Sequence, residues 1–303
     1  MSQSISVRVP ATSANLGCLF DTGAIAVGLY LKLSASLRTD TQISISVRGL
    51  HSERISTGED NLAARVLQSQ LGEWGISSGF DLEIENEIPI GAGLGSSAAA
   101  IVGALALATG ITGRAQDDEE IVSRATRIEG HPDNVAAAWL GGFTVAMQDG
   151  ERVLLRNCPV PRGIKLVVVV PDYALSTEKA RAVLPQQYSR ADAIHNLQRA
   201  VFIAAQFFSG RADFSQALFD DRLHQPYRAS LMPGLSEVLA FHHPDLIGIC
   251  LSGAGPSVLA FARGYTDALG RGICRIFAAN GIQAKAYAFE PDNFGAKGRM
   301  PES

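Results

Sequence analysis

Cysteine is scarce in this 303-residue chain: there are four, far apart, and no two form a C-x-x-C pair. This spacing suits neither a zinc site nor a disulfide framework. Cys18, Cys158, Cys250 and Cys274 are therefore expected to be free thiols, as is usual in a reducing compartment. The sequence predicts a cytoplasmic protein.

Two further absences exclude whole classes of partner. The longest strongly apolar stretches, Ile164–Val170 and Ala98–Ala108, are shorter than the roughly 20 residues that span a bilayer. The first twenty residues also lack a basic segment followed by an apolar block. A basic excess, which proteins that bind a phosphate backbone need, is missing as well, because the net charge is −4 and the pI is 5.9. Neither a membrane nor a nucleic acid is an expected partner.

The residues that are present indicate a globular protein with a sizeable core. Hydrophobic residues make up 47% of the chain and charged residues 18%, a composition that excludes disordered and coiled-coil chains. The length predicts about two domains. Asp149–Gly163 carries turn residues and two prolines without clear periodicity, so we expect the boundary there, with domains at 1–155 and 156–303.

Strands and helices are mixed in both halves, which is typical of an α+β or α/β protein. Alternating or short apolar runs predict strands at Ile5–Val9, Ala24–Leu37, Ile43–Val47, Phe80–Glu85, Phe143–Met147, Ile164–Val170, Gly248–Ser252, Ser257–Ala262 and Ile282–Phe289. Helical periodicity predicts helices at Asn61–Leu71, Ser97–Ala108, Asp117–Ile128, Ser176–Leu184, Ala191–Phe208 and Thr266–Ala279. The second of these helices is apolar on nearly every side and should be buried.

The most informative segment is a glycine-rich loop that leads into this apolar helix. It reads Pro89-Ile90-Gly91-Ala92-Gly93-Leu94-Gly95-Ser96-Ser97-Ala98-Ala99. Alternate glycines allow positive φ and bring N–H groups close to a ligand, and a helix N-terminus adds unpaired donors and a positive dipole end. The loop therefore predicts a phosphate site. Its two serines could instead cap the helix in an ordinary strand-to-helix turn.

Two other phosphate loops compete with this interpretation. A Walker loop needs a lysine, and this loop contains none, which excludes that class. Gly93-x-Gly95-x-x-Ala98 matches a dinucleotide fingerprint, but no strand ending in Asp or Glu follows about 20 residues later. A second glycine turn, Leu251–Ser257, would by itself be only a hairpin.

Together these loops resemble the motifs of the GHMP kinases, a superfamily of small-molecule kinases. The motifs also come in the family's order, beginning with Pro10-Ala11-Thr12-Ser13-Ala14-Asn15-Leu16-Gly17. Within the superfamily, the chain most resembles the homoserine kinases. The segments that carry this resemblance are Ser13–Gly17 with Phe20-Asp21, Glu129-Gly130-His131-Pro132-Asp133-Asn134, and Gln225-Pro226-Tyr227-Arg228. One departure is Cys18-Leu19, where the family usually has Pro-Gly, and we expect it to reshape the turn that presents Asp21.

The resemblance implies an α+β protein with the GHMP kinase fold. Its N-terminal domain would be like the second domain of ribosomal protein S5, its C-terminal domain would be ferredoxin-like, and the active site would lie between them. It implies ATP-dependent phosphorylation of the side-chain hydroxyl of L-homoserine, a step of threonine biosynthesis, with Mg²⁺, and a homodimer. A kinase for another small alcohol, such as threonine or mevalonate, and a dinucleotide-dependent oxidoreductase are the alternatives.

The resemblance also assigns roles to residues. ATP would be bound by Pro89–Ala99 (Pro89, Ile90, Gly91, Ala92, Gly93, Leu94, Gly95, Ser96, Ser97, Ala98, Ala99) and Gly253, and Mg²⁺ by Ser97 and Glu129. The substrate would be held by Asn15, Asp21, His131, Arg181 and Arg228. The catalytic residues would be Asn134, Thr177 and Asn15. Without the resemblance, Glu129 could equally be a solvated carboxylate at the end of a helix, and Asn15 could form an Asx turn.

The chemistry explains why these residue types suit the reaction. Phosphoryl transfer rests mainly on positioning and on neutralising charge on the phosphoryl oxygens. Arginine offers a planar fork for the substrate carboxylate, and Asp21 offers a counter-charge for its ammonium. Asn134 stands where mevalonate kinase has an aspartate, and an amide does not accept a proton at neutral pH. We therefore expect catalysis without a protein base.

Overall fold

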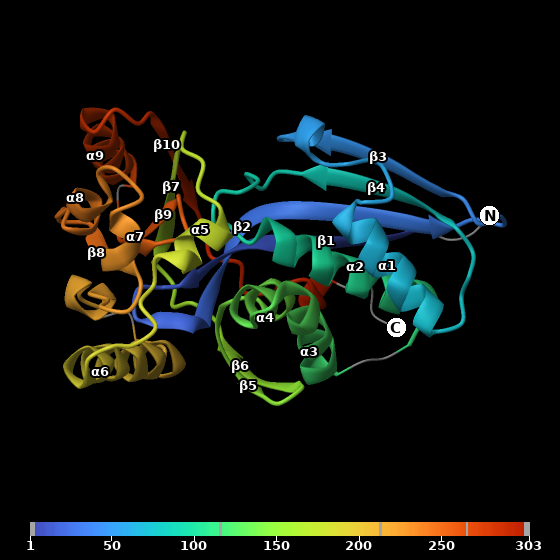
Figure 1. Cartoon of the computed structure of the whole chain (residues 1–303), viewed down its shortest axis with the longest axis horizontal. Helices are drawn as coiled ribbons and strands as arrows, with labels where there is room; N and C mark the ends of the chain where they lie inside the picture. Colours follow the sequence, from blue (N-terminus) through green and yellow to red (C-terminus); the bar gives the residue numbers. More distant parts are fainter. Residues whose placement is uncertain (1–3, 115–116, 212–213, 265, 300–303) are drawn as a thin grey trace.

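The computed structural model describes residues 4–114, 117–211, 214–264 and 266–299, which form two β-sheets with helices packed against them (Figure 1). The first sheet contains the strands β1 (Ile5–Asn15), β2 (Leu19–Leu37), β3 (Ile43–Gly49), β4 (Phe80–Asn86), β5 (Phe143–Asp149) and β6 (Arg152–Cys158). Their order is β3-β4-β2-β5-β6, and β1 pairs with β2. The long strand β2 carries the sheet, because its two halves pair with β4 and β5 respectively.

Four helices pack in the first unit: α1 (Leu62–Glu73), α2 (Ser96–Thr112), α3 (Asp118–Glu129) and α4 (Asp133–Leu140). The apolar helix α2 is buried from Ala98 to Ala108, as its sequence predicts, and packs on β1 and β2 with α1 and α3 alongside. Asn61 and Asp117 cap α1 and α3, because their side-chain oxygens accept backbone N–H groups of the first turn. The burial of α2 fixes the position of its N-terminus.

The second unit has the order of a ferredoxin-like sheet. It contains β7 (Lys165–Pro171), α5 (Thr177–Ala182), α6 (Arg190–Phe208), α7 (Gln225–Ala229), α8 (Leu235–Leu239), β8 (Leu246–Leu251), β9 (Val258–Ala262), α9 (Thr266–Ala279) and β10 (Ala284–Phe289). The strands lie in the order β10-β7-β9-β8, all antiparallel, which is 4-1-3-2 in chain order. Short 3₁₀ helices lie at Ser52–Arg54, Gln216–Phe219 and Lys297–Arg299.

Several features differ from the sequence predictions: β1 runs on to Asn15, and the short helices α7 and α8 were not predicted. The segment expected to be turns contains β6, which pairs with β5 and buries Val153 and Leu155; the consecutive leucines at 154 and 155 obscure its alternation. The chain after β10 also returns to the first sheet, where the Gly28 N–H donates to the Glu290 carbonyl at 3.0 Å. The division at 155/156 falls within β6 and stays a prediction.

The two units share a packed junction. Phe143 of β5 stacks on Phe207 of α6 with ring centroids 4.1 Å apart. Along the described ranges, no helix is both long and apolar enough to cross a membrane. The junction brings the N-terminus of α2 opposite the loops of the second sheet, where the predicted site residues lie.

Candidate active site

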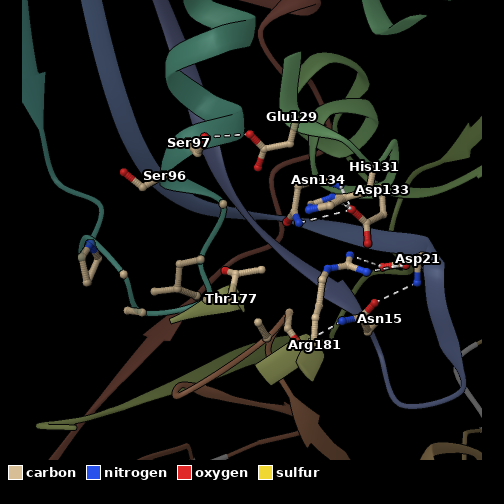
Figure 2. A pocket seen from close by; sticks show the side chains of 18 of the residues that line it. Asn15, Asp21, Ser96, Ser97, Glu129, His131, Asp133, Asn134, Thr177 and Arg181 are labelled. Atoms are coloured by element: carbon tan, nitrogen blue, oxygen red, sulfur yellow. Dashed lines mark hydrogen bonds and ion pairs between the residues drawn. The ribbon is translucent and has the colours of Figure 1, made fainter. Parts of the chain in front are cut away.

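A polar cleft lies where the two units meet. Its walls come from the end of β1, the glycine loop before α2, the α3–α4 connection, α5, α7 and the β8–β9 turn. The lining residues are Asn15, Asp21, Pro89, Gly91, Ala92, Gly93, Leu94, Gly95, Ser96, Ser97, Glu129, His131, Asp133, Asn134, Thr177, Arg181, Arg228, Gly253 and Ala254. Every motif of the sequence analysis thus reaches one cleft (Figure 2).

The glycine loop is held in a shape that only glycine allows. Gly91, Gly93 and Gly95 all have positive φ, between 68° and 76°. A Cβ on Gly93 would lie 2.3 Å from the Ser252 carbonyl oxygen, and a Cβ on Gly95 would lie 1.9 Å from Thr12 Oγ1. A side chain at Gly93 would therefore push the loop away from the β8–β9 turn, and one at Gly95 would push it away from β1.

Hydrogen bonds join this loop to the other two motifs. The Thr12 N–H donates to the Leu94 carbonyl at 3.1 Å, and the Ser257 N–H donates to the Ala92 carbonyl at 3.2 Å. Ser252 Oγ donates to the Gly93 carbonyl at 2.7 Å. The β8–β9 turn, which alone would be a hairpin, is thus part of the cleft wall.

No side chain caps α2, which excludes the alternative of an ordinary serine cap. Gly95 is the N-cap residue, in the left-handed conformation and without a side-chain acceptor. Ser97 Oγ instead donates to Glu129 Oε2 at 2.7 Å, as Figure 2 shows. The positive end of the α2 dipole and the first-turn N–H groups therefore remain available to an anion in the cleft.

Glu129 is the last residue of α3 and is not a freely solvated carboxylate. Burial raises its pKa above the usual value, while the hydrogen bond from Ser97 and the nearby His131 oppose that rise. Glu129 and Ser97 come from different helices and together offer a carboxylate and a hydroxyl. Such hard oxygen donors are the ligands that Mg²⁺ prefers.

The turn between β1 and β2 presents Asp21 through a strained backbone. Asn15, Leu16 and Asp21 have positive φ values of 72°, 37° and 52°. The Asp21 N–H donates to Asn15 Oδ1 at 2.9 Å, and Asn15 Nδ2 donates to the Gly253 carbonyl at 2.9 Å. Both ends of the Asn15 side chain are therefore engaged with backbone, which makes it a support of the turn, as an Asx-type residue would be.

The replacement of Pro-Gly by Cys18-Leu19 is absorbed inside this turn. Cys18 Sγ donates to the Asp220 carbonyl at 3.1 Å, and burial strongly raises the pKa of its thiol. Leu19 is also buried, and Asp21 still reaches the cleft.

Asp21 and Arg181 form a two-pronged ion pair with each other. Arg181 Nη1 donates to Asp21 Oδ2 at 3.0 Å, and Nη2 donates to Oδ1 at 2.8 Å. Arg181 lies in α5 one turn after Thr177, which is in the first turn of that helix and is exposed to the cleft. Both charged side chains are about one-third exposed, at 39% and 34%, so the pair is accessible to a ligand.

Arg228 has the opposite character, because it is buried and has no anionic partner within the part of the chain that the structure describes. It is 1% exposed. Its Nε donates to the Ala180 carbonyl at 3.0 Å, and its Nη1 donates to the Gly253 carbonyl at 3.0 Å and to His224 Nδ1 at 3.1 Å. Among the described residues, Nη2 has no hydrogen-bond partner. Burial, and then the Arg181 charge, lower the pKa of Arg228 to about 10.

His131, Asp133 and Asn134 form a compact cluster at the start of α4. His131 Nδ1 contacts Asp133 Oδ1 at 2.9 Å, and this bond raises the pKa of His131. Thr12 Oγ1 donates to Asn134 Oδ1 at 2.7 Å, which leaves the Asn134 amide group to face the cleft as a donor. The amide nitrogen also reaches Asp133 Oδ1 at 3.3 Å.

The comparisons with known proteins agree with this geometry. The model of the GHMP kinases N terminal domain matches residues 60–142. Homoserine kinase from Moorella thermoacetica is 39% identical over 292 residues, 96% of this chain and 98% of that protein. Homoserine kinase from Solibacter usitatus is 41% identical over 281 residues, 91% of this chain and 90% of that one. The chain belongs to the homoserine kinase family, within the GHMP kinases.

The fold of the family is confirmed in full. The crystal structure of homoserine kinase from Cytophaga hutchinsonii is 25% identical, covers 97% of both chains and superposes with a TM-score of 0.86. The dinucleotide-dependent oxidoreductase is therefore excluded. Its Gly-x-Gly-x-x-Ala match lies between β4 and α2, but the next strand, β5, pairs only antiparallel, with β2 and β6, so the loop opens no parallel βαβ unit of the dinucleotide fold.

Most of the predicted site residues line the cleft, and a few do not. Ile90, Ala98 and Ala99 fall outside the lining; the two alanines are fully buried beneath the first turn of α2. Sequence reasoning gave no role to Asp133, Thr12 or His224. Asp133 lies between the predicted residues His131 and Asn134, and this position could have indicated that it belongs to the site. Nothing in the sequence indicated His224, because its contacts with Arg228 and Gly17 form only in the folded chain.

Proposed function

We propose that this protein transfers the γ-phosphoryl group of ATP to the side-chain hydroxyl of L-homoserine, forming O-phospho-L-homoserine. Curated relatives named homoserine kinase match it over nearly their whole length, which supports the reaction class. The single observation that carries the substrate class is the state of Arg228. A buried guanidinium without an anionic partner is costly, and a carboxylate from the substrate would supply the missing counter-charge.

The paired residues Asp21 and Arg181 fit the remaining charges of an amino acid. A substrate that carries both a carboxylate and an ammonium can insert between them, because each charged group of the pair then gains a new partner of opposite sign. A hydroxy acid without an ammonium would leave Asp21 uncompensated once Arg181 turned to the substrate. We therefore propose Arg228 and Arg181 for the carboxylate and Asp21 for the ammonium.

Asn134, Thr177 and His131 would orient the reacting hydroxyl and the transferred group. The Asn134 amide is turned so that it donates into the cleft, since its oxygen accepts from Thr12. A donor stabilises charge on a phosphoryl oxygen but takes no proton. The proton of the hydroxyl would therefore leave through phosphate or water. His131, whose pKa is raised beside Asp133, would add positive charge near the phosphoryl group or the substrate.

The residues present also fit ATP and Mg²⁺. The loop Pro89–Ser97 and the open N-terminus of α2 offer N–H donors for phosphates. Ser97 and the half-buried Glu129 are the residues that would hold Mg²⁺, whose chemistry is to bridge phosphate oxygens and offset their charge. No group of three or more His, Cys, Asp or Glu that could hold a metal ion occurs in the described ranges, in keeping with an ion that keeps several waters and phosphate oxygens.

A coupled ADP-release assay with homoserine, threonine, serine and mevalonate tests the proposal. We expect kcat/KM to be highest for homoserine by at least about tenfold. A higher kcat/KM for threonine would support an amino-acid site but would show that threonine, not homoserine, is the substrate. A higher value for mevalonate, which has a carboxylate but no ammonium, would contradict the role of Asp21.

A homodimer in the cytoplasm is the remaining part of the proposal. The second copy is implied by the family, and α6 exposes Leu197, Val201 and Phe202 at 63%, 61% and 55%, an apolar face that a second copy would cover. Sedimentation velocity checks the assembly. A monomer at micromolar concentration would contradict it.

A further inference from the structure

A second groove lies on the first unit, between α1 and α3, with α2 as its floor. Its polar lining includes Arg65, Gln70 and Glu73 of α1 and Arg124 and Arg127 of α3, and Leu105 of α2 lies at its base. Arg124 Nη1 and Glu73 Oε2 form an ion pair across it. None of these residues belongs to the cleft described above.

Gln70 is the unusual member of this groove. It falls on the inward stripe of α1, with Ala63, Val66, Leu67 and Leu71, where the helical period calls for an apolar residue. It is 2% exposed, and neither Nε2 nor Oε1 has a hydrogen-bond partner. A buried amide left unpaired in this way is destabilising. Both of its polar atoms are closed to solvent, so a ligand would pair with them once the Gln70 side chain turns toward the groove.

The charges of the groove identify the sign of its ligand. Three arginines, Arg65, Arg124 and Arg127, face one carboxylate, Glu73, which is already paired with Arg124. Within the described ranges, Arg65 and Arg127 have no ion-pair partner, and the buried Arg124 Nε has no acceptor. The groove therefore offers two exposed cations, and the Arg124 Nε–H and the Gln70 amide lie buried in its wall.

We propose that this groove is a binding site for a small carboxylate that also carries a hydroxyl or amino group. The carboxylate would be held by Arg127, Arg65 and the Nε–H of Arg124. The added hydroxyl or amino group would pair with the Gln70 amide, which both donates and accepts. Because α3 ends at Glu129, which contacts Ser97 in the cleft, a ligand here touches the helix that carries the proposed Mg²⁺ carboxylate.

The test compares L-malate with succinate, which differ by one hydroxyl. Binding to the full chain is measured by titration calorimetry at constant ionic strength, without nucleotide or homoserine, so that the result does not depend on the proposed kinase activity. We expect L-malate to bind about tenfold more tightly than succinate, the effect of one hydrogen bond. L-Aspartate should behave like L-malate, and inorganic phosphate tests whether any small anion suffices.

Three variants locate the binding. Gln70→Met keeps the size of the side chain and removes its polar atoms, so it should abolish the preference for malate over succinate. Arg127→Gln should weaken both acids about tenfold. Arg271→Gln, an exposed arginine of α9 outside the groove, is the matched control and should change neither.

Gln70→Met should also unfold at the same temperature as the wild type or higher, because an unpaired buried amide is lost. If Gln70→Met is instead less stable than the wild type, the proposal is judged on the binding to Arg127→Gln, because Arg127 is exposed. Saturable binding that survives both substitutions would belong to another cation, such as Arg228 in the cleft, and would overturn the proposal. Equal affinity for malate, succinate and phosphate in the wild type, or no saturable binding, would overturn it as well.

Discussion

The sides of the cleft that we propose for the nucleotide and for the substrate are built from different kinds of group. The nucleotide side is one continuous segment, Pro89–Ser97, whose binding groups are backbone N–H donors and a helix dipole, joined by the Ser97–Glu129 pair. The substrate side takes single side chains from four separate segments: Asp21, His131, Arg181 and Arg228. Backbone donors cannot be changed by substitution without changing the loop, whereas a charged side chain can be replaced alone.

The electrostatics of the two sides differ as well. On the substrate side, Asp21 is paired with Arg181 and His131 with Asp133, so most charges are already balanced. Arg228 is the exception, with three neutral acceptors around it. Selectivity on this side therefore depends on which ligand balances Arg228 without leaving Asp21 or Arg181 unpaired. On the nucleotide side, the only requirement is that the ligand is an anion that fits the glycine loop.

The largest expected effect is on the nucleotide side. Ser97→Ala removes the hydroxyl that contacts Glu129, and we expect kcat to fall by about 10²–10³-fold, as for other single donors that act in a transition state. Stability should hardly change, because Ser97 caps no helix. Steady-state kinetics and thermal unfolding of the purified variant measure the two effects separately.

Ser96→Ala is the matched control, since Ser96 lines the same loop but its hydroxyl has no contact with Glu129. Its loss of kcat should be clearly smaller. A Ser97→Ala variant that is destabilised yet turns over almost normally would place the hydroxyl in the folding of the loop rather than in phosphoryl transfer.

The second effect separates the two sides. Arg228→Lys keeps the charge but not the fork, so KM for homoserine should rise about 10- to 100-fold while KM for ATP stays nearly constant. Lysine also cannot make all the contacts to Ala180, His224 and Gly253, so the unfolding temperature is recorded beside the kinetics.

Arg222→Lys, an arginine in the same stretch that is 48% exposed and paired with Asp192, serves as the control and should leave both KM values unchanged. If Arg228→Lys raised KM for ATP as much as KM for homoserine, Arg228 would belong to the nucleotide side. The proposed difference between the two sides would then be wrong.

The same division explains what could be predicted from the sequence. The glycine loop and α2 are contiguous, so their position could be predicted from local pattern, and their role as a phosphate site stays a proposal. Most of the helices and strands were placed within a few residues, but the short helices α7 and α8 were not predicted. The pairing of Asp21 with Arg181 joins residues 160 positions apart, and nothing local encodes it. The return of Glu290 to β2 was missed for a similar reason, because this contact joins segments that come together only on folding. The strand β6 was missed for a local reason, because its consecutive leucines obscure the alternation.

A smaller effect tests the chemistry on the substrate side. Asn134→Asp replaces a donor by a carboxylate beside Asp133, and we expect kcat to fall by about tenfold, because negative charge near the phosphoryl group is repulsive. General-base help requires hydrogen-bond reach of the hydroxyl. The pH–rate profile should show no new acidic limb. A faster variant whose kcat falls below a carboxylate pKa would show that this site can use a base, and the base-free mechanism would be wrong.

The smallest effect concerns stability and lies behind Arg228. His224 is fully buried, and burial lowers its pKa to about 4; its Nδ1 accepts from Arg228 and its Nε2 contacts the Gly17 carbonyl at 2.7 Å. Because the unfolded histidine binds a proton near pH 6.5 and the folded one does not, the stability that neutral His224 contributes is complete above about pH 6.5. It declines as the pH falls toward 4.

At pH 5.5 the loss should be about 1 kcal/mol relative to pH 7.5. His224→Gln keeps one donor and one acceptor but does not titrate, so its free energy of unfolding should be lower at pH 7.5 and decline less toward pH 5.5. Urea unfolding of both proteins at the two pH values measures the difference. An identical decline in both proteins would mean that folded His224 is protonated at pH 5.5, as it is in the unfolded chain. A second cation would then lie beside Arg228 at that pH, and the substrate side would hold more uncompensated charge than its hydrogen bonds indicate.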